Sequence, residues 1–289
     1  MVKSNLVALL SLAALALPAA AQQDETFVEI QPGDVSTDPD NLMAGADRGD
    51  VRALNNIGLL WARGVGVPAP DFQEAMRWWK EAAKRGYSVS MNNLGLLYAN
   101  GNGVKQDYAE ALKWWEMSAE QGDAWAMNSI GDLYEHGQGV ERDYAQARDW
   151  YERAAQAGDG LAMYNLGSMH ENGRGVEVNL KSAMGWYERS ADKGIGVAMH
   201  ELGKMIAAGK SVPADPAEAH AWMLVAGAYF TAEDQAEAAR NAEALAALAA
   251  ALSEQQMERS REIAKNLRAR IEERRKIEPL KTGPGESET

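Results

Sequence analysis

The amino-acid sequence predicts an all-α protein, a solenoid of about five helix-turn-helix repeats of 36 residues. Glycines and tryptophans recur every 36 residues, in register with one another. The two rows consist of Gly95, Gly131, Gly167 and Gly203, and of Trp78, Trp114, Trp150, Trp186 and Trp222. The composition agrees, with 46% hydrophobic residues and only nine prolines. A single helix pair cannot bury its apolar face, but a stack of pairs can.

The first helix of each unit has apolar residues at helical spacing. In the second unit these are Met91, Leu94, Leu97 and Tyr98. The methionines at this period, from Met91 to Met199, are interpreted as core residues. Each first helix should end at a glycine, because glycine adopts the left-handed conformation that closes the last helical carbonyls. The glycine pairs that follow these helices are Gly64/Gly66, Gly101/Gly103, Gly137/Gly139 and Gly173/Gly175.

The second helix of each unit should begin after an aspartate, which accepts hydrogen bonds from the first free backbone N–H groups. These residues are Asp71, Asp107, Asp143 and Asp215. Asn179 replaces the aspartate in the fourth unit, so a less firm helix start is expected there. The second helices carry a small–aromatic–small stripe such as Ala111, Trp115 and Ser118. The mid-helix glycine opposite costs about 1 kcal/mol against alanine, and we expect it to admit the neighbouring backbone.

Both ends of the chain differ from the repeats. Residues 1–21 are predicted to be a signal peptide, with Lys3 before an uncharged apolar run and small residues up to Ala21. A periplasmic or secreted protein, cleaved near Ala21, is expected; a retained membrane anchor is the alternative. Residues 22–40 are assigned to a flexible leader, 41–232 to the array, 233–280 to two C-terminal capping helices, and 281–289 to a disordered tail. Ser253 and Gln256 form a capping-box pattern at the start of the last helix.

Composition excludes several classes of function. The chain has no cysteine, which excludes disulfides, thiolate metal sites and thiol catalysis. Its formal net charge of −13 makes nucleic acid a poor partner, since an acidic surface repels phosphate. No later segment has the apolar length of a membrane span, so a soluble and monomeric mature protein is expected.

No pattern of residues predicts a catalytic or metal site. The four histidines form no HxxxH or HExxH pair, so neither a metal nor a cofactor is predicted. Gly209-Lys210-Ser211 resembles the end of a phosphate-binding loop. However, Gly203 precedes Gly209 by five intervening residues where the motif needs four, and a helix stands where the motif requires a strand. Glu135, His136 and Glu171 could meet at one rim, but ordinary solvent-exposed polar side chains are the favoured explanation. The chain is therefore predicted not to be an enzyme.

The repeat pattern resembles a known family. Leu-Gly-x-x-Tyr, Gly-x-Gly-Val, Asp-x-x-x-Ala and Trp-Tyr/Trp at this period are similar to the Sel-1-like repeats, relatives of the tetratricopeptide repeats. The resemblance covers about Val51 to Phe230. It departs in the fifth unit, where Ile206 replaces the tyrosine and Ser211 the second loop glycine. The resemblance implies a right-handed superhelix that serves as a protein-interaction scaffold.

By analogy with tetratricopeptide arrays, the first helices should line a concave face. The residues expected there, which we predict to bind a protein or peptide, are Asn55, Asn92, Trp125, Asn128, Asp132, Tyr164, Ser168, His200 and Lys204. Amides of an asparagine row would bond the backbone of an extended peptide, while Trp125 and Tyr164 hold its side chains. The alternative is that these side chains pack between adjacent first helices and bind nothing.

The predicted function is that of an exported adaptor in an envelope signalling or assembly system. Some relatives restrain the periplasmic part of a sensor kinase, which is one concrete version. An enzyme acting on a cell-wall or β-lactam substrate is a second hypothesis, suggested by cysteine-rich relatives whose cysteines this chain lacks. A self-assembling structural protein is the third.

Overall fold

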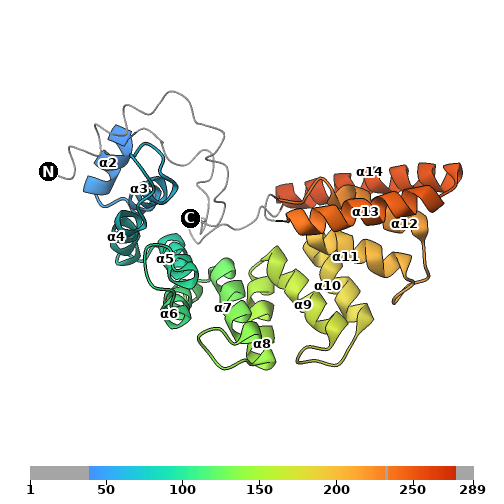
Figure 1. The fold of residues 1–289 in the computed structure, drawn as a ribbon, viewed down its shortest axis with the longest axis horizontal. Helices are drawn as coiled ribbons and strands as arrows, with labels where there is room; N and C mark the ends of the chain where they lie inside the picture. The colour runs from blue at the N-terminus through green and yellow to red at the C-terminus, as the bar shows by residue number, and fades with distance from the viewer. Residues whose placement is uncertain (1–38, 232–233, 278–289) are drawn as a thin grey trace. The chain divides into compact units, whose positions relative to one another are not determined.

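The structure, a computed structural model, describes residues 39–231 and 234–277 (Figure 1). These residues form thirteen helices and no strand, which confirms the predicted helical solenoid. They divide into two compact units, 39–142 and 143–277, and each is described by itself. The hand of a superhelix is not a property of either unit alone, so the right-handed twist stays a prediction.

The first unit contains two complete helix pairs and the first helix of a third. Its helices are α2 (Pro39–Asp47), α3 (Val51–Arg63), α4 (Phe72–Ala83), α5 (Ser88–Asn100), α6 (Tyr108–Ala119) and α7 (Ala124–His136). α3 packs on α4 and α5 on α6, while α4 and α6 each pack on the following first helix. Before the pairs, α2 buries Leu42 and Met43 against Ala53 and Ile57 of α3. α2 therefore covers the start of the array.

The second unit contains the remaining repeat helices and the two C-terminal helices. They are α8 (Tyr144–Gln156), α9 (Gly160–Asn172), α10 (Leu180–Asp192), α11 (Gly196–Ala207), α12 (Pro216–Ala226), α13 (Gln235–Ala251) and α14 (Glu254–Ile277). α9 pairs with α10, and α11 pairs with α12. Their shared core is one cluster that includes Tyr187, Met199, Leu202 and Trp222. The methionine row is buried in both units, as predicted.

In three of the helix pairs an aromatic ring of the second helix lies against the glycine of the first. A Cβ on Gly58 or Gly95 would overlap the indole of Trp79 or Trp115, respectively. The two indole Nε1–H groups donate to the carbonyl oxygens of Asn55 and Asn92, at 3.1 and 3.3 Å. In these pairs the expectation that glycine admits a neighbouring backbone is wrong: the missing side chain admits an aromatic ring.

Tyr187 takes the place of the indole in the fourth repeat. Its ring carbon Cδ1 lies 2.6 Å from the Cβ that an alanine at Gly167 would have. The fifth repeat differs, because Met223 occupies the ring position beside Gly203 and the carbonyl of Ala219 lies nearby. The close approach at the glycine is therefore kept when tyrosine or methionine replaces the indole.

The predicted caps are present. Asp71, Asp107, Asp143 and Asp215 each accept two backbone N–H bonds at the start of a second helix. Asn179 accepts only one, from Ser182, in agreement with the weaker start expected for the fourth unit. Ser211 stands in the left-handed region at φ 71°, so the loop keeps its shape without the second glycine.

The C-terminal helices attach to the last repeat through buried polar pairs. Asn241 of α13 lies 2.9 Å from Nδ1 of His200, and its amide donates to the carbonyl of Met223. Ser260 of α14 lies 2.8 Å from Nδ1 of His220. α14 packs on α12 and α10, whereas α13 packs on α12. The capping-box pattern at Ser253 is confirmed by a reciprocal pair of bonds with Gln256.

Among the described residues, no helix is both long and apolar enough to cross a membrane. The predicted signal peptide, the predicted leader up to residue 38, and the predicted tail lie outside the described residues. Residues 39 and 40 of the predicted leader begin α2.

Replacing Gly95 by alanine should destabilise the array. The added methyl group collides with the buried ring of Trp115, and overpacking of this kind costs about 1–3 kcal/mol. Gly185→Ala in α10 is the matched control, because a Cβ there meets no atom within 4 Å. It should raise stability by up to about 1 kcal/mol through helix propensity. Chemical denaturation followed by circular dichroism measures both; equal effects would contradict the ring-on-glycine interpretation.

Acid should weaken the attachment of α14. Burial, and then the charge of Arg261, lower the pKa of His220 below its ordinary value of 6.5. The unfolded chain therefore binds this proton more tightly than the folded chain. The contribution of His220 to folding stability is fully present above pH 6.5 and is lost as the pH falls below it. The melting temperature should fall less between about pH 7 and pH 5 in His220→Gln than in the wild type. His136→Gln, at an exposed histidine, should behave like the wild type.

Candidate functional site

The predicted site residues include a middle row of the first helices, which is buried except at Tyr164 and consists of Asn55, Asn92, Asn128, Tyr164 and His200. Asn55 and Asn92 are 3% and 1% exposed. The Asn55 side-chain oxygen accepts hydrogen bonds from the Ser90 hydroxyl at 2.9 Å and from the Asn93 amide at 3.1 Å. These donors lie on the next first helix, so Asn55 joins α3 to α5. The expectation that this row is exposed is wrong, because its amides already bond the neighbouring helix.

Asn92, at the equivalent position one repeat later, also bonds the segment that follows. Its side chain hydrogen-bonds the carboxylate of Asp123, the residue that caps α7. Burial raises the pKa of that carboxyl, while the bonds from Asn92 and the backbone lower it. Asn128 is buried as well, and His200 is buried against Asn241. Four of the five positions in this row, Tyr164 being the exception, are therefore closed to an extended peptide.

The predicted site residues outside this row, Trp125, Asp132, Ser168 and Lys204, form the outer rows and are more accessible. Trp125 is half-buried and stands edge-on to Trp115, with ring centroids 6.0 Å apart. Asp132 and Ser168 are half-buried, and Lys204 is exposed. Leu161, at the position of Trp125 one repeat later, is 42% exposed. These residues, unlike the asparagines, can meet a partner.

In the second unit, accessible residues gather around Tyr164 on α9 and α11. We call the group Leu161, Tyr164, Ser168, Glu201 and Lys204 the Tyr164 surface. Residues 161, 164 and 168 lie on one face of α9, since side chains three and four positions apart are neighbours on a helix. The Tyr164 ring packs at a tilt on Tyr187, with centroids 5.6 Å apart. The surface thus combines an aliphatic, an aromatic and a hydroxyl side chain.

The polar side chains beside this surface are held by one another. Arg174 donates to the Ser168 hydroxyl at 2.7 Å. Lys204 pairs with Glu201 on α11 at 2.7 Å. Glu171 accepts from the Tyr187 hydroxyl at 3.0 Å and from Lys210 at 3.1 Å. Positive and negative groups are interspersed, a pattern that favours a peptide of mixed charge over a uniformly charged ligand.

Both tyrosines are held in the neutral form. Burial raises the pKa of Tyr164, and the carboxylates of Glu201 and Glu237 add to the effect. Burial also raises the pKa of Tyr187, with further contributions from Glu171 and Glu201. Each therefore acts as an aromatic platform with a neutral hydroxyl.

The described residues show no arrangement for metal binding, since no three His, Cys, Asp or Glu side chains gather as ligands there. Glu135 is buried in the first unit, and His136 lies 2.9 Å from the carbonyl of Asp132. Glu171, in the second unit, is engaged by Tyr187 and Lys210. Burial or hydrogen bonds within the fold therefore account for each of the three residues predicted at the rim.

A Ser-x-x-Lys sequence, the nucleophile motif of penicillin-binding enzymes, escaped the sequence reasoning. It occurs at Ser190 to Lys193. Ser190 is fully buried, and its hydroxyl donates to the carbonyl of Gly160 at 2.7 Å. This serine occupies the small position of the stripe, where it ties α10 to α9. Its contacts account for it as a packing residue.

Comparison with known proteins identifies the repeats. The Sel1 repeat family model matches five segments that together cover more than half of the chain: 51–87, 88–123, 126–159, 160–195 and 196–228. No match is found among curated protein sequences. Sel1 repeats generally mediate protein–protein interaction, and the family is typically a non-enzymatic scaffold.

The chain is similar to several solved structures. A Sel1 repeat protein from Oxalobacter formigenes is 32% identical, with a TM-score of 0.59; the match covers 67% of this chain and 79% of that one. A sel1 repeat protein from Klebsiella pneumoniae is 22% identical over 70% of this chain and 97% of that one, with a TM-score of 0.47. An immunity protein from Pseudomonas aeruginosa is 18% identical over 96% and 88%, also with a TM-score of 0.47.

Asn55→Ala should lower stability. The substitution leaves the Ser90 hydroxyl and the Asn93 amide without their buried acceptor, a loss of about 1–3 kcal/mol. Asn100→Ala, at an exposed position on α5, is the control and should change stability by less than about 0.5 kcal/mol. Urea denaturation measures the difference. Unchanged stability of Asn55→Ala would mean that the buried amide is dispensable for packing.

Proposed function

Because the chain belongs to the Sel1 repeat family, we propose that it is an exported adaptor that binds an extended segment of a protein partner on the outer rows of its first helices. The proposal rests on the difference in exposure between the middle row and the outer rows of the first helices. The middle row is closed by bonds between helices, as at Asn55, whereas the outer rows keep Trp125, Leu161 and Lys204 accessible.

The Tyr164 surface supplies the contacts that an extended segment needs. Leu161 and the half-buried Tyr164 ring can take apolar side chains, and aromatic anchors of this kind dominate binding energies at interfaces. Ser168 offers a hydroxyl that can both donate and accept. Lys204 and Glu201 present opposite charges on α11, the first helix of the next pair. These charges would set the register of a charged partner.

Trp125 offers a comparable anchor in the first unit. Its ring is half-buried, and the edge contact with Trp115 holds it in place. An anchor whose rotamer is already restricted loses little entropy on binding. Asp132 lies seven residues further along α7, about two turns away on the same helix face, and provides a carboxylate there.

Export to the envelope is part of the proposal. It is supported by the composition of residues 1–21, in which Lys3 precedes an uncharged apolar run that ends in small residues. The absence of cysteine suits an oxidising compartment, since no thiol can be lost to oxidation. Adaptors in signalling or assembly at the envelope would work in this setting, and we expect no turnover of cell-wall or β-lactam substrates.

A photoreactive amino acid placed at Leu161 of the full chain should trap a protein partner in living cells. The complex should appear in the fraction released by osmotic shock if the protein is periplasmic, or in the medium if it is secreted. Val178, 62% exposed in the loop after α9, is the matched control position and should trap none. Tyr164→Ala should reduce trapping about tenfold through loss of a central aromatic anchor, whereas Tyr164→Phe should retain most of it.

Equal trapping from positions 161 and 178 would refute the first-helix surface. A complex found only inside the cytoplasm would refute export and leave the binding surface standing. The helical circular dichroism signal of each variant excludes loss of the fold as the cause of lost trapping.

A further inference from the structure

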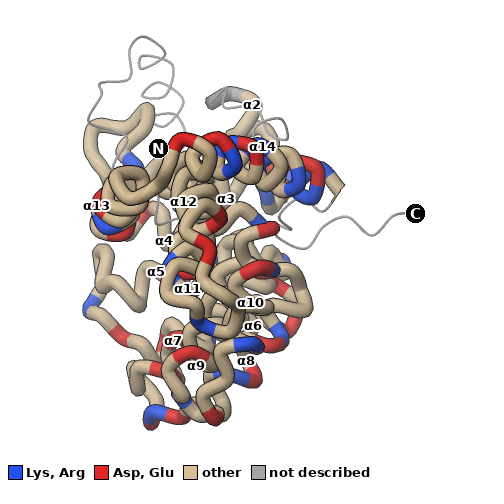
Figure 2. Tube along the Cα trace, turned by 90° about the vertical axis from the view of Figure 1, so that its right-hand side faces the viewer, with Lys and Arg blue, Asp and Glu red and all other residues tan. Residues whose placement is uncertain are grey.

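Basic residues recur along α14, where Figure 2 marks them in blue, and six of the eight fall into two sets by their contacts. One set fastens the helix to the repeats. Arg259 donates to both carboxylate oxygens of Asp215 at 3.0 and 2.7 Å, and its hydrogen bond holds the pKa of that carboxyl below the ordinary value. Arg270 and Arg274 reach the carboxylate of Asp192 at 3.1 and 2.9 Å. These three arginines therefore attach α14 to the repeats.

The second set has no such role. Arg261, Lys265 and Arg268 are spaced at i, i+4 and i+7, which places them on one exposed face of α14. Arg261 makes one loose pair with Glu258, 3.4 Å away and largely exposed like Arg261 itself. Throughout the described ranges, Lys265 and Arg268 form no ion pair. In a chain of net charge −13, cations without a carboxylate partner are conspicuous.

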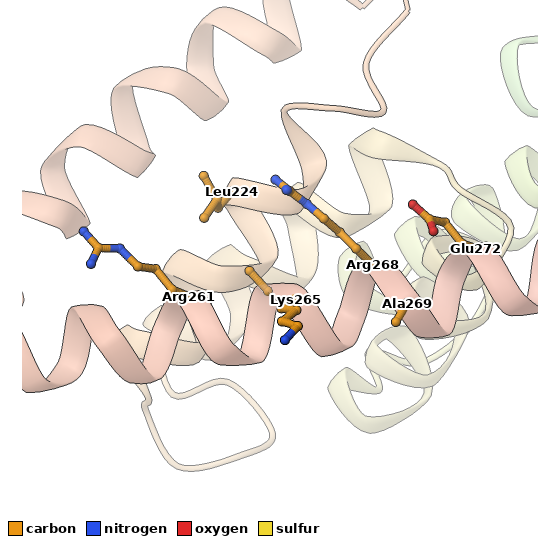
Figure 3. A pocket seen from close by; sticks show the side chains of 7 residues that line it. Leu224, Arg261, Lys265, Arg268, Ala269 and Glu272 are labelled. Atoms are coloured by element: carbon orange, nitrogen blue, oxygen red, sulfur yellow. The ribbon is translucent and has the colours of Figure 1, made fainter.

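These cations border a hollow between α14 and α12. Leu224 of α12 and Ala264 and Ala269 of α14 supply its apolar lining, and its volume is about 380 Å³. Figure 3 shows the Arg268 side chain extending toward Leu224. The volume is at the low end of the roughly 300–1,000 Å³ of small-molecule sites. An open hollow of this size on a helix accommodates one or two side chains of a docked segment.

We propose that this surface, the α14 hollow, docks an acidic amphipathic helix from a protein partner. Carboxylates repeating every three or four residues along such a helix match the spacing of Arg261, Lys265 and Arg268. An apolar side chain of the same helix would enter the hollow against Leu224, as in other helix-in-groove complexes. Glu272 closes one end of the lining, so the docked helix should present a neutral or basic residue there.

The inference does not depend on the proposed function, because the α14 hollow shares no residue with the Tyr164 surface. It names a second attachment point, which would let one chain hold two partners or two segments of one partner. Anionic lipid and nucleic acid are the other ligands that a cationic row can attract. Neither uses an apolar hollow beside the charges in the way that an amphipathic helix does.

The test is binding of a fluorescein-labelled amphipathic peptide, with glutamate on one face and leucine on the other, to the purified full chain. Anisotropy at low salt should show binding that weakens as salt rises. The double variant Lys265→Glu/Arg268→Glu should lose about tenfold in affinity. Lys105→Glu/Lys181→Glu reverses two exposed lysines elsewhere, so it makes the same change in net charge and should bind like the wild type.

Three results would overturn the proposal. The first is absence of peptide binding to the wild type. The second is equal weakening in the two charge-reversal variants, which would make the effect one of net charge. The third is binding of phosphatidylglycerol vesicles or of a DNA duplex that depends on Lys265 and Arg268 while the peptide does not bind. A peptide with lysine in place of glutamate should not bind, and Leu224→Ser should weaken the glutamate peptide.

Discussion

In both units of this protein an aromatic side chain of a second helix lies in the space left by a glycine of the first helix. Trp115 fills that space at Gly95, and its indole N–H donates to the carbonyl of Asn92. The contact sets how closely the two helices of a pair approach and in which register. The small residues on either side of the ring, such as Ala111 and Ser118, are fully buried because of that approach. The packing of the first, second and fourth repeats depends on this contact.

The close approach within each pair has a consequence for binding. It leaves the middle row of the first helices facing the next first helix, where Asn55 and Asn92 bond across the junction. An amide used in this way holds the stack together and cannot also recognise a peptide. The predicted site residues of the outer rows stay accessible. The same repeat thus places a packing residue and an accessible residue at nearby positions of one helix.

The end of the array is closed by different means. α13 and α14 scarcely contact each other, and each packs on α12. Polar pairs, His200 with Asn241 and His220 with Ser260, fix them on the last repeat. Because α14 does not pack as the second helix of a pair, its outward face keeps cations that have no role in the array. This is how a capping helix can present a surface that the repeats lack.

The sequence by itself determined the number of repeats, the order of the helices, and the caps at their ends. These follow from local rules: glycine in left-handed turns, aspartate before a helix, and a period of 36 residues. The residues of the buried stripe could also be predicted, because their spacing is that of a helix face. Only the tertiary structure decided which first-helix rows are open. The period places Asn55, Tyr164 and Lys204 equally well on a first helix, but their exposure depends on how far the next helix reaches over them. That distance depends on the ring-on-glycine contact and on the neighbouring side chains, and neither is encoded by spacing alone.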